Sequence, residues 1–320
     1  MSNGPLGGGT FSLEGRPTPG LYLVAWVLSG IGLGVVIISF QTAPPFVGIL
    51  LLAGLGLLLL GLSAGAGYQL AVRRGHPPEM YHGPSPLLLL AIWFVAVNLL
   101  GTVLIIAGVA DTDQPIGFLA VGGLQVALYV GIVWLFVVRS GAMSWREMRL
   151  LPGNNSAGSV ADASFAAGVM LPTTFGALVL ALVVALSLGT QAPAVVPVPQ
   201  TALDTVIVAL NAAILIPIGE EVFFRGYALS AWLRDLGPRS ALIRSTLFFA
   251  AVHIANVRTV TFDEGWRQAA LVLAVIVPVG AVLGWLMLNR GLVASVAGHI
   301  TYNGILIGLM VLTRFLPVPA

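Results

Sequence analysis

Two adjacent carboxylates and an arginine interrupt a strongly apolar part of this sequence. Glu220, Glu221 and Arg225 lie in IGEEVFFRG, which continues the apolar run VIVALNAAILIPI. Ionisable side chains are costly inside a membrane-spanning helix, and where they occur they commonly serve catalysis, a proton relay or a substrate pathway. The types and the spacing of these three residues therefore indicate a functional site.

Helical spacing gives the two glutamates different surroundings. A helix turns about 100° per residue, so Glu221 and Arg225, four positions apart, share a face and are expected to form an ion pair. Glu220 points about 100° away from Glu221 and need not share that arginine. A buried carboxylate without a close cation exchanges protons near neutral pH, which suits a general base or acid. Pro217 lacks a backbone donor and is expected to kink the helix just before the pair.

Two further polar motifs follow toward the C-terminus. In FAAVH, Phe249 precedes His253 by one helical turn, and its ring is expected to pack under the imidazole. In HITYN, His299 and Asn303 are four positions apart and project from one helical face. Two hydrogen-bond donors directed at one point are what the stabilisation of an oxyanion requires.

The sequence also predicts the depth of the two histidines. His253 follows Arg244 by nine residues (253 − 244), and His299 follows Arg290 by nine residues (299 − 290). If each arginine begins its helix at the inner membrane surface, both imidazoles lie about 13 Å inside it. Three helices are then expected to bring a carboxylate, two imidazoles and an amide to one layer.

Each of these features by itself is more typical of a structural role. A single intramembrane histidine is often a hydrogen-bonded packing residue, and the Glu221–Arg225 pair alone is more typical of structure than of catalysis. Asn303 alone is compatible with polar contact between helices. The coincidence of all three motifs at matched depth favours a functional site.

Composition identifies the class of protein that carries these motifs. The chain has 320 residues, of which 58% are hydrophobic and 8% charged, with a mean hydropathy of +1.00. Soluble domains have about 25% charged residues, so this low charged fraction excludes an ordinary soluble fold. The absence of cysteine excludes disulfides, thiolate metal sites and a cysteine nucleophile. The basic residues form no cluster dense enough for nucleic-acid binding.

Apolar segments recur along the whole chain and predict an all-α, polytopic membrane protein of about eight or nine transmembrane helices. The seventh candidate is the weakest, because its first turns carry Arg239 and Arg244. The nine candidates are 21–41, 46–69, 86–110, 116–138, 165–189, 204–226, 239–257, 268–288 and 291–313.

Arginine placement predicts the orientation of these segments. All fourteen basic residues are arginine. With the N-terminus in the cytoplasm, ten arginines lie at inner ends and three at outer ends, which agrees with the positive-inside rule. An arginine-only chain rich in Ala, Gly, Leu and Val is typical of a GC-rich bacterial genome. We therefore expect a multi-pass protein of the bacterial plasma membrane with a cytoplasmic N-terminus.

The polar stretch between residues 139 and 164 is the expected internal boundary. It predicts an N-terminal four-helix membrane region over 1–160, poor in polar residues and of unknown role. A second region, 161–320, contains all three motifs and forms the expected catalytic core.

Read together, EEVFFR, FAAVH and HITYN resemble the three motifs of the CPBP (Abi) family of intramembrane proteases, which includes the CAAX-processing endopeptidases. The resemblance covers roughly residues 165 to 315. It implies that Glu220 and His253 activate the attacking water and that His299 and Asn303 hold the oxyanion. Glu221, Arg225 and Phe249 would support the site.

The resemblance also implies the cofactor alternatives. Members of the family have been described as metal-free glutamate proteases and as metalloproteases. Two histidines and a glutamate are adequate zinc ligands, so Glu220, His253 and His299 would form the metal site if zinc is bound. The HExxH arrangement is absent from the sequence, and we favour the glutamate-type mechanism without a cofactor over a metalloendopeptidase.

The leading hypothesis is an intramembrane endopeptidase that hydrolyses membrane-associated substrates near the cytoplasmic leaflet. Its expected partners are the lipid bilayer and a membrane protein or lipid-anchored peptide as substrate. One alternative is a proton-coupled transporter, which uses the same residue types, although the sequence shows no inverted repeat. A second alternative is a catalytically silent membrane scaffold of the same fold.

Overall fold

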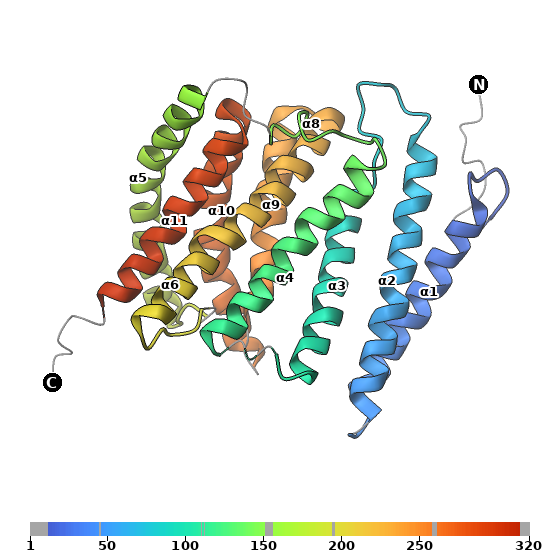
Figure 1. Ribbon diagram of the computed structural model, residues 1–320, viewed down its shortest axis with the longest axis horizontal. Coiled ribbons are helices and arrows are strands. Elements are labelled where there is room, and N and C mark those ends of the chain that lie inside the picture. Colours follow the sequence, from blue (N-terminus) through green and yellow to red (C-terminus); the bar gives the residue numbers. More distant parts are fainter. Residues whose placement is uncertain are drawn as a thin grey trace. The chain divides into compact units, whose positions relative to one another are not determined.

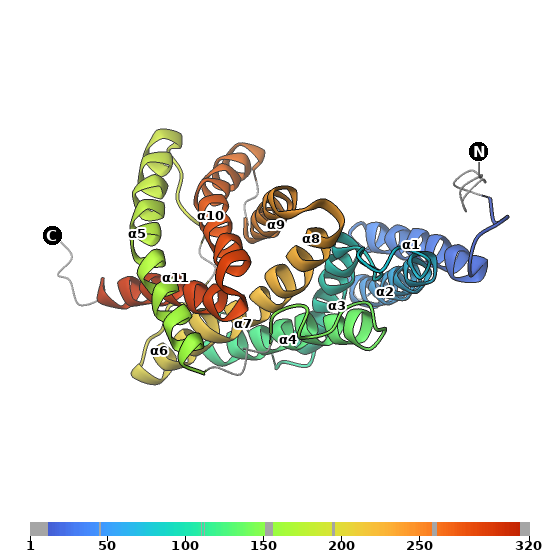
Figure 2. The same ribbon diagram turned by 90° about the horizontal axis from the view of Figure 1, so that it is seen from above.

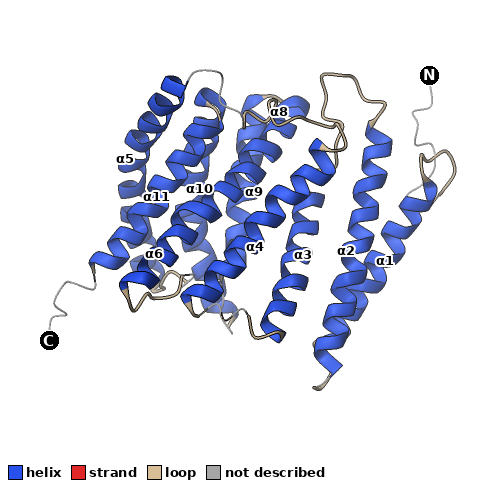
Figure 3. Ribbon diagram, viewed as in Figure 1, coloured by secondary structure: helices blue, strands red, loops and turns tan. Residues whose placement is uncertain are grey.

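The computed structural model consists of helices joined by short connections, and no strand occurs among the residues that it describes (Figure 3). The fold of the described residues is therefore all-α, as the recurring apolar segments predicted. The described residues are 12–44, 46–109, 111, 113–150, 156–193, 196–257 and 261–313.

Eight helices in the described part of the chain are long and apolar enough to cross a membrane, which confirms the expected polytopic class. The seventh predicted segment corresponds to α9 (Pro238–His253), which has only 16 residues and is not among the eight. The eight spans are α1 (Pro19–Ser39), α2 (Phe46–Arg73), α3 (Pro86–Ile106), α4 with its π-helical end η1 (Pro115–Val138), most of α5 (Ser156–Leu188), the continuous segment Ala202–Leu236, α10 (Phe262–Arg290) and α11 (Leu292–Leu312).

The chain divides into two compact units. One comprises 1–108 and 130–144 and holds α1 to α3. In it, Gly32 and Gly61 let α1 and α2 approach closely, because a β carbon on either glycine would lie 2.5 Å from backbone nitrogen of the other helix. The second unit comprises 109–129 and 145–320. The two domains expected at 1–160 and 161–320 remain a prediction.

The second unit has its apolar core among α5, α10 and α11, which lie side by side in both views (Figures 1 and 2). Small and large side chains interlock there, so that the three helices pack closely. The buried members of this core are Ala166, Met170, Ala177, Val279, Leu283, Leu286, Ala294 and Tyr302.

The segment with both glutamates is one continuous helix that changes its winding. It consists of α6 (Ala202–Ala209), η2 (Leu210–Leu215), α7 (Ile216–Glu221), η3 (Val222–Leu229) and α8 (Ser230–Leu236). The parts η2 and η3 are π-helical. Such wider turns are rare and often occur at functional sites. Here they lie on both sides of the short α-helical piece that ends in the two glutamates.

Single glycines join the helices that carry the histidines. Gly237 (φ 76°) alone separates α8 from α9, and Gly291 (φ 92°) alone separates α10 from α11. Only glycine adopts these backbone angles without strain. The two turns therefore fix where α9 and α11 begin.

These turns correct the depth estimate made from the arginines. Arg244 lies six residues inside α9, which begins at Pro238, and Arg290 ends α10 instead of beginning the next helix. His253 is the last residue of α9, whereas His299 lies about two turns into α11. Each histidine follows an arginine by nine residues, but the two histidines lie at different distances from the starts of their helices.

Candidate active site

Glu221 is the centre of a buried polar network. Its Oε1 accepts hydrogen bonds from Arg225 NH1 at 3.0 Å and from His299 Nδ1 at 2.9 Å. Its Oε2 accepts one from the Ser295 hydroxyl. Glu221 and Arg225 are fully buried, and they form the ion pair that their spacing predicts. Since a buried charge is tolerated only when it is paired and hydrogen-bonded, Glu221 is a structural anchor for two helices.

Arg225 is held from three sides. Besides Glu221, its NH2 donates to the carbonyl of Gly280 at 3.2 Å. Its guanidinium carbon lies 3.9 Å from the centre of the Phe249 ring, within the range of a cation–π contact. Arg225 thereby links η3 to α9 and α10, the helices that carry Phe249 and Gly280.

Glu220 faces a different environment, as its place on the helix predicted. Its carboxylate lies 3.7 Å from His299 Nε2, and its side chain keeps 14% of its surface exposed. That separation is too long for a hydrogen bond and short enough for an ion pair when the imidazole is protonated. Glu220 is thus the carboxylate of the pair that an incoming molecule can reach.

His299 lies between the two glutamates, and its contacts determine which of its ring nitrogens carries a hydrogen. Glu221 also accepts from Arg225, so it is an ionised acceptor and His299 Nδ1 must donate to it. In the neutral imidazole Nε2 then carries a lone pair, and only the imidazolium has a donor directed toward Glu220. A role of His299 as a donor to an oxyanion therefore requires the protonated ring.

His253 is oriented by its own helix. Its Nδ1 is 2.8 Å from the carbonyl oxygen of Phe249, which can only accept, so Nδ1 carries the hydrogen. Nε2 is left with its lone pair and can accept a proton from water. The Phe249 ring lies 4.4 Å from this imidazole and 5.8 Å from that of His299, centre to centre. Phe249 therefore contacts both histidines and the guanidinium.

Asn303 lies one turn beyond His299 on α11. Its Nδ2 donates to the carbonyl of Ala212 in η2 at 2.8 Å. One amide hydrogen is thereby committed to the protein, and the second remains for another acceptor.

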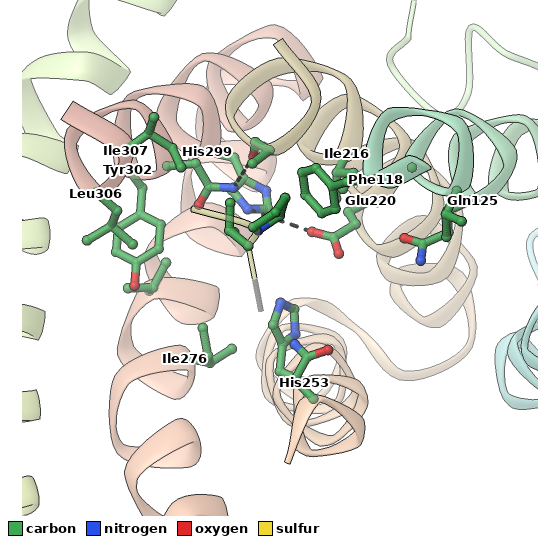
Figure 4. A pocket seen from close by; sticks show the side chains of 18 of the residues that line it. Phe118, Gln125, Ile216, Glu220, His253, Ile276, His299, Tyr302, Leu306 and Ile307 are labelled. Carbon is green, nitrogen blue, oxygen red and sulfur yellow. Dashed lines mark hydrogen bonds and ion pairs between the residues drawn. The ribbon is translucent and has the colours of Figure 1, made fainter. Parts of the chain in front are cut away.

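These side chains line one cavity of about 600 Å³. Glu220, His253 and His299 point into its centre from three different helices, although they are far apart in the sequence (Figure 4). Apolar residues form most of the remaining wall. These include Phe118, Val121, Ile216, Ile276, Leu306 and Ile307. The site therefore combines an apolar wall with a few convergent polar groups, as ligand pockets commonly do.

The residues do not form a ready metal site. Glu220, His253 and His299 are chemically suited to zinc. Across the described ranges, however, no three His, Asp or Glu side chains are grouped so that they could hold a metal ion. Both histidines use Nδ1 for contacts within the protein, which leaves Nε2 of each ring as the nitrogen that could bind a metal ion.

The comparison with protein families bears on the same helices. The family model described as type II CAAX prenyl endopeptidase Rce1-like matches residues 202–305. The chain carries an Rce1-like domain of the CPBP (CAAX protease) family. The family that the three motifs resembled is confirmed, and the Rce1-like domain contains all of them. The match over residues 202–305 supports a CAAX-protease-like peptidase embedded in the membrane. Searches of the curated proteins and of the solved structures find no match to this chain.

Sequence reasoning missed two residues of this site. Ser295 lies inside the Rce1-like domain and donates to Glu221, and its spacing of four residues before His299 was an available signal. Gln125 lies on α4, outside the Rce1-like domain, and lines the cavity beside Glu220 (Figure 4). The sequence feature that could have indicated Gln125 is its amide side chain within an otherwise apolar span.

Proposed function

We propose that this chain is an intramembrane endopeptidase in which Glu220 and His253 activate a water molecule that attacks a peptide bond. The observation that carries the proposal is the arrangement around the cavity. Glu220 is reachable beside His299, while Glu221 is fully engaged by Arg225, Ser295 and His299. One glutamate is thus free to exchange protons, and the other holds its neighbours in place.

In the proposed reaction, water gives a proton to Glu220 or to Nε2 of His253 and attacks the carbonyl carbon of the scissile bond. The carbonyl oxygen becomes the oxyanion of a tetrahedral intermediate. Protonated His299 and the second amide hydrogen of Asn303 donate to this oxygen. The group that took the proton, Glu220 or His253, returns it to the amide nitrogen as the carbon–nitrogen bond breaks, which releases a carboxylic acid and an amine.

The orientation inferred from the arginines indicates where in the membrane the substrate would be cleaved. His299 is seven residues from the start of α11, about 10 Å along the helix axis. With that start on the inner side, the bond would be cut in the part of the membrane near the cytoplasmic leaflet. The substrates would be membrane proteins or lipid-anchored peptides, and the membrane would be a bacterial plasma membrane.

The test is cleavage by the purified protein in liposomes, offered a library of quenched-fluorescent peptides. We expect Glu220→Gln to lower the turnover number by about 10²–10⁴-fold, because the proton acceptor is lost and the size is kept. The control is Glu79→Gln, which alters an exposed glutamate that does not line the cavity. Normal cleavage by a folded Glu220→Gln variant would refute the proposal, as would an inactive wild type.

The same assay decides between the glutamate-type and the metal-dependent mechanism. We propose the glutamate type, because Glu220 and His253 can activate water by proton transfer alone. Treatment with a strong chelator is then expected to leave the cleavage rate unchanged. Loss of cleavage that added zinc restores would identify a metalloendopeptidase instead.

A further inference from the structure

One face of α11 forms part of the cavity wall. The residues on this face recur at i, i+3, i+4, i+7 and i+8, and they are His299, Tyr302, Asn303, Leu306 and Ile307. The proposed reaction uses His299 and Asn303 of this set. Tyr302 stands directly before Asn303 in the chain and borders the same cavity.

The ring of Tyr302 is held by the apolar core of the second unit. Tyr302 is only 6% exposed and belongs to the buried core among α5, α10 and α11. Val279 belongs to that core and also lines the cavity. Tyr302 therefore lies where the core ends and the cavity begins. Since core side chains are closely packed, its ring is fixed in place before a ligand binds.

The hydroxyl group of Tyr302 has no hydrogen-bond partner within the described ranges of the chain. Other hydroxyls of α11 are engaged, because Thr301 donates to the carbonyl of Ala297 and Ser295 donates to Glu221. A largely buried hydroxyl without a partner costs about 1–3 kcal/mol, and a phenylalanine would fill the same space without that cost. The hydroxyl is thus a polar group that the fold itself does not use.

The close view places Tyr302 across the cavity from Glu220, with His299 and His253 between them (Figure 4). The labelled side chains on the side of Tyr302 are apolar, namely Ile276, Leu306 and Ile307 (Figure 4). A hydrogen bond is stronger in apolar surroundings than in water. A tyrosine hydroxyl can donate, and a peptide unit offers a carbonyl oxygen as acceptor.

From this geometry we infer that the Tyr302 hydroxyl binds the backbone of the substrate. It donates a hydrogen bond to the carbonyl of a peptide unit next to the scissile bond, on the side of the cavity away from Glu220. This contact keeps the bond to be cut beside Glu220. The inference rests on the proposed endopeptidase function and adds a substrate-binding residue to it.

The first test is Tyr302→Phe, which removes the hydroxyl and keeps the ring. Its KM for the best-cleaved member of the fluorogenic peptide library in liposomes is expected to rise about three- to tenfold, the effect of losing one neutral hydrogen bond. Its kcat should change by less than about threefold, because the contact is present in the ground state and in the transition state alike. Thermal stability in detergent should not fall, since the fold does not use the hydroxyl.

The second test changes the acceptor on the substrate. Backbone carbonyls flanking the scissile bond are replaced one at a time by thioamides, whose sulfur accepts hydrogen bonds weakly. With wild type, one of these peptides should show a raised KM. With Tyr302→Phe, the same replacement should raise KM little further, because both changes remove one and the same contact.

The matched control is Tyr227→Phe. Tyr227 is fully buried but does not line the cavity, so this variant should keep the KM of wild type. An unchanged KM in Tyr302→Phe overturns the inference. A fall in kcat at constant KM overturns it as well, because that result assigns the hydroxyl to the oxyanion.

Two further results would contradict the inference. A joint loss of activity and thermal stability in Tyr302→Phe would make the hydroxyl structural, and additive effects for every thioamide would show that it contacts no backbone carbonyl. If the wild type cleaves no peptide, the proposed function fails and the inference fails with it. If the wild type cleaves and Tyr302→Phe matches it, the inference alone fails.

Discussion

At the scale of single residues, the two neighbouring glutamates have opposite roles although they are chemically identical. Glu221 accepts from Arg225, His299 and Ser295, and it has no exposed surface. Glu220 has one partner at ion-pair distance and borders the cavity. The difference arises from the turn of about 100° between consecutive helical residues.

The first residue-scale prediction concerns Arg225. Arg225→Met leaves the carboxylate of Glu221 buried without its cation, and we expect a loss of about 3–5 kcal/mol in the free energy of unfolding. Thermal or denaturant unfolding in detergent measures this loss. Arg267→Met is the control, because its pair with Asp263 is partly exposed and such pairs contribute little. Equal effects of the two substitutions would contradict the structural role assigned to the buried pair.

A second residue-scale prediction concerns Ser295. Ser295→Ala removes a donor to Glu221 while the Arg225 and His299 contacts remain. We expect the protein to fold with a loss of about 1–3 kcal/mol in unfolding free energy, because a buried acceptor is left partly unsatisfied. The cleavage rate should fall less than in Glu220→Gln. A cleavage loss as large as that of Glu220→Gln would show that Ser295 acts in the chemistry itself.

At the scale of elements, glycines at the helix contacts decide how the site is assembled. Gly237 and Gly291 set the starts of α9 and α11, and Gly122 lets α4 approach η2. None of these residues takes part in the proposed chemistry. They determine which side chains face the cavity.

The prediction at this scale uses two neighbouring glycines of α4. Gly122→Ala places a methyl group against Asn211, whereas a β carbon on Gly123 meets nothing within 4 Å. We expect Gly122→Ala to lower the free energy of unfolding by about 1–3 kcal/mol through overpacking. Its KM for the library peptide should also rise, since the part of the cavity wall on α4 moves with the helix. Gly123→Ala should match wild type in both measurements, and equal behaviour of the two variants would contradict the close packing of α4.

At the scale of the whole molecule, the proposed site of cleavage depends on how the chain is oriented in the membrane. The excess of arginines at one set of helix ends, ten against three, favours a cytoplasmic N-terminus. The absence of cysteine makes the orientation measurable without first removing any native thiol.

We expect Ser140→Cys to react with a membrane-impermeant maleimide only after the cells are opened. Ser140 is exposed and stands beside Arg139, at an end assigned to the cytoplasm. Phe262→Cys, at a position that is 89% exposed at the start of α10, should react in intact cells. The reverse pattern of labelling would invert the orientation and move the proposed cleavage to the outer leaflet.

The sequence by itself determined the all-α membrane class, the three motifs with their family, and the Glu221–Arg225 pair. These follow from composition and from spacing within one helix, which are local properties. Only the tertiary structure decided that Ser295 completes the Glu221 network and that Gln125 borders the cavity. It also showed that glycine turns, not arginines, mark the starts of α9 and α11. Helical periodicity fixes which side chains share a face of one helix. Which helix that face meets depends on contacts between residues far apart in the chain, and no local spacing records them.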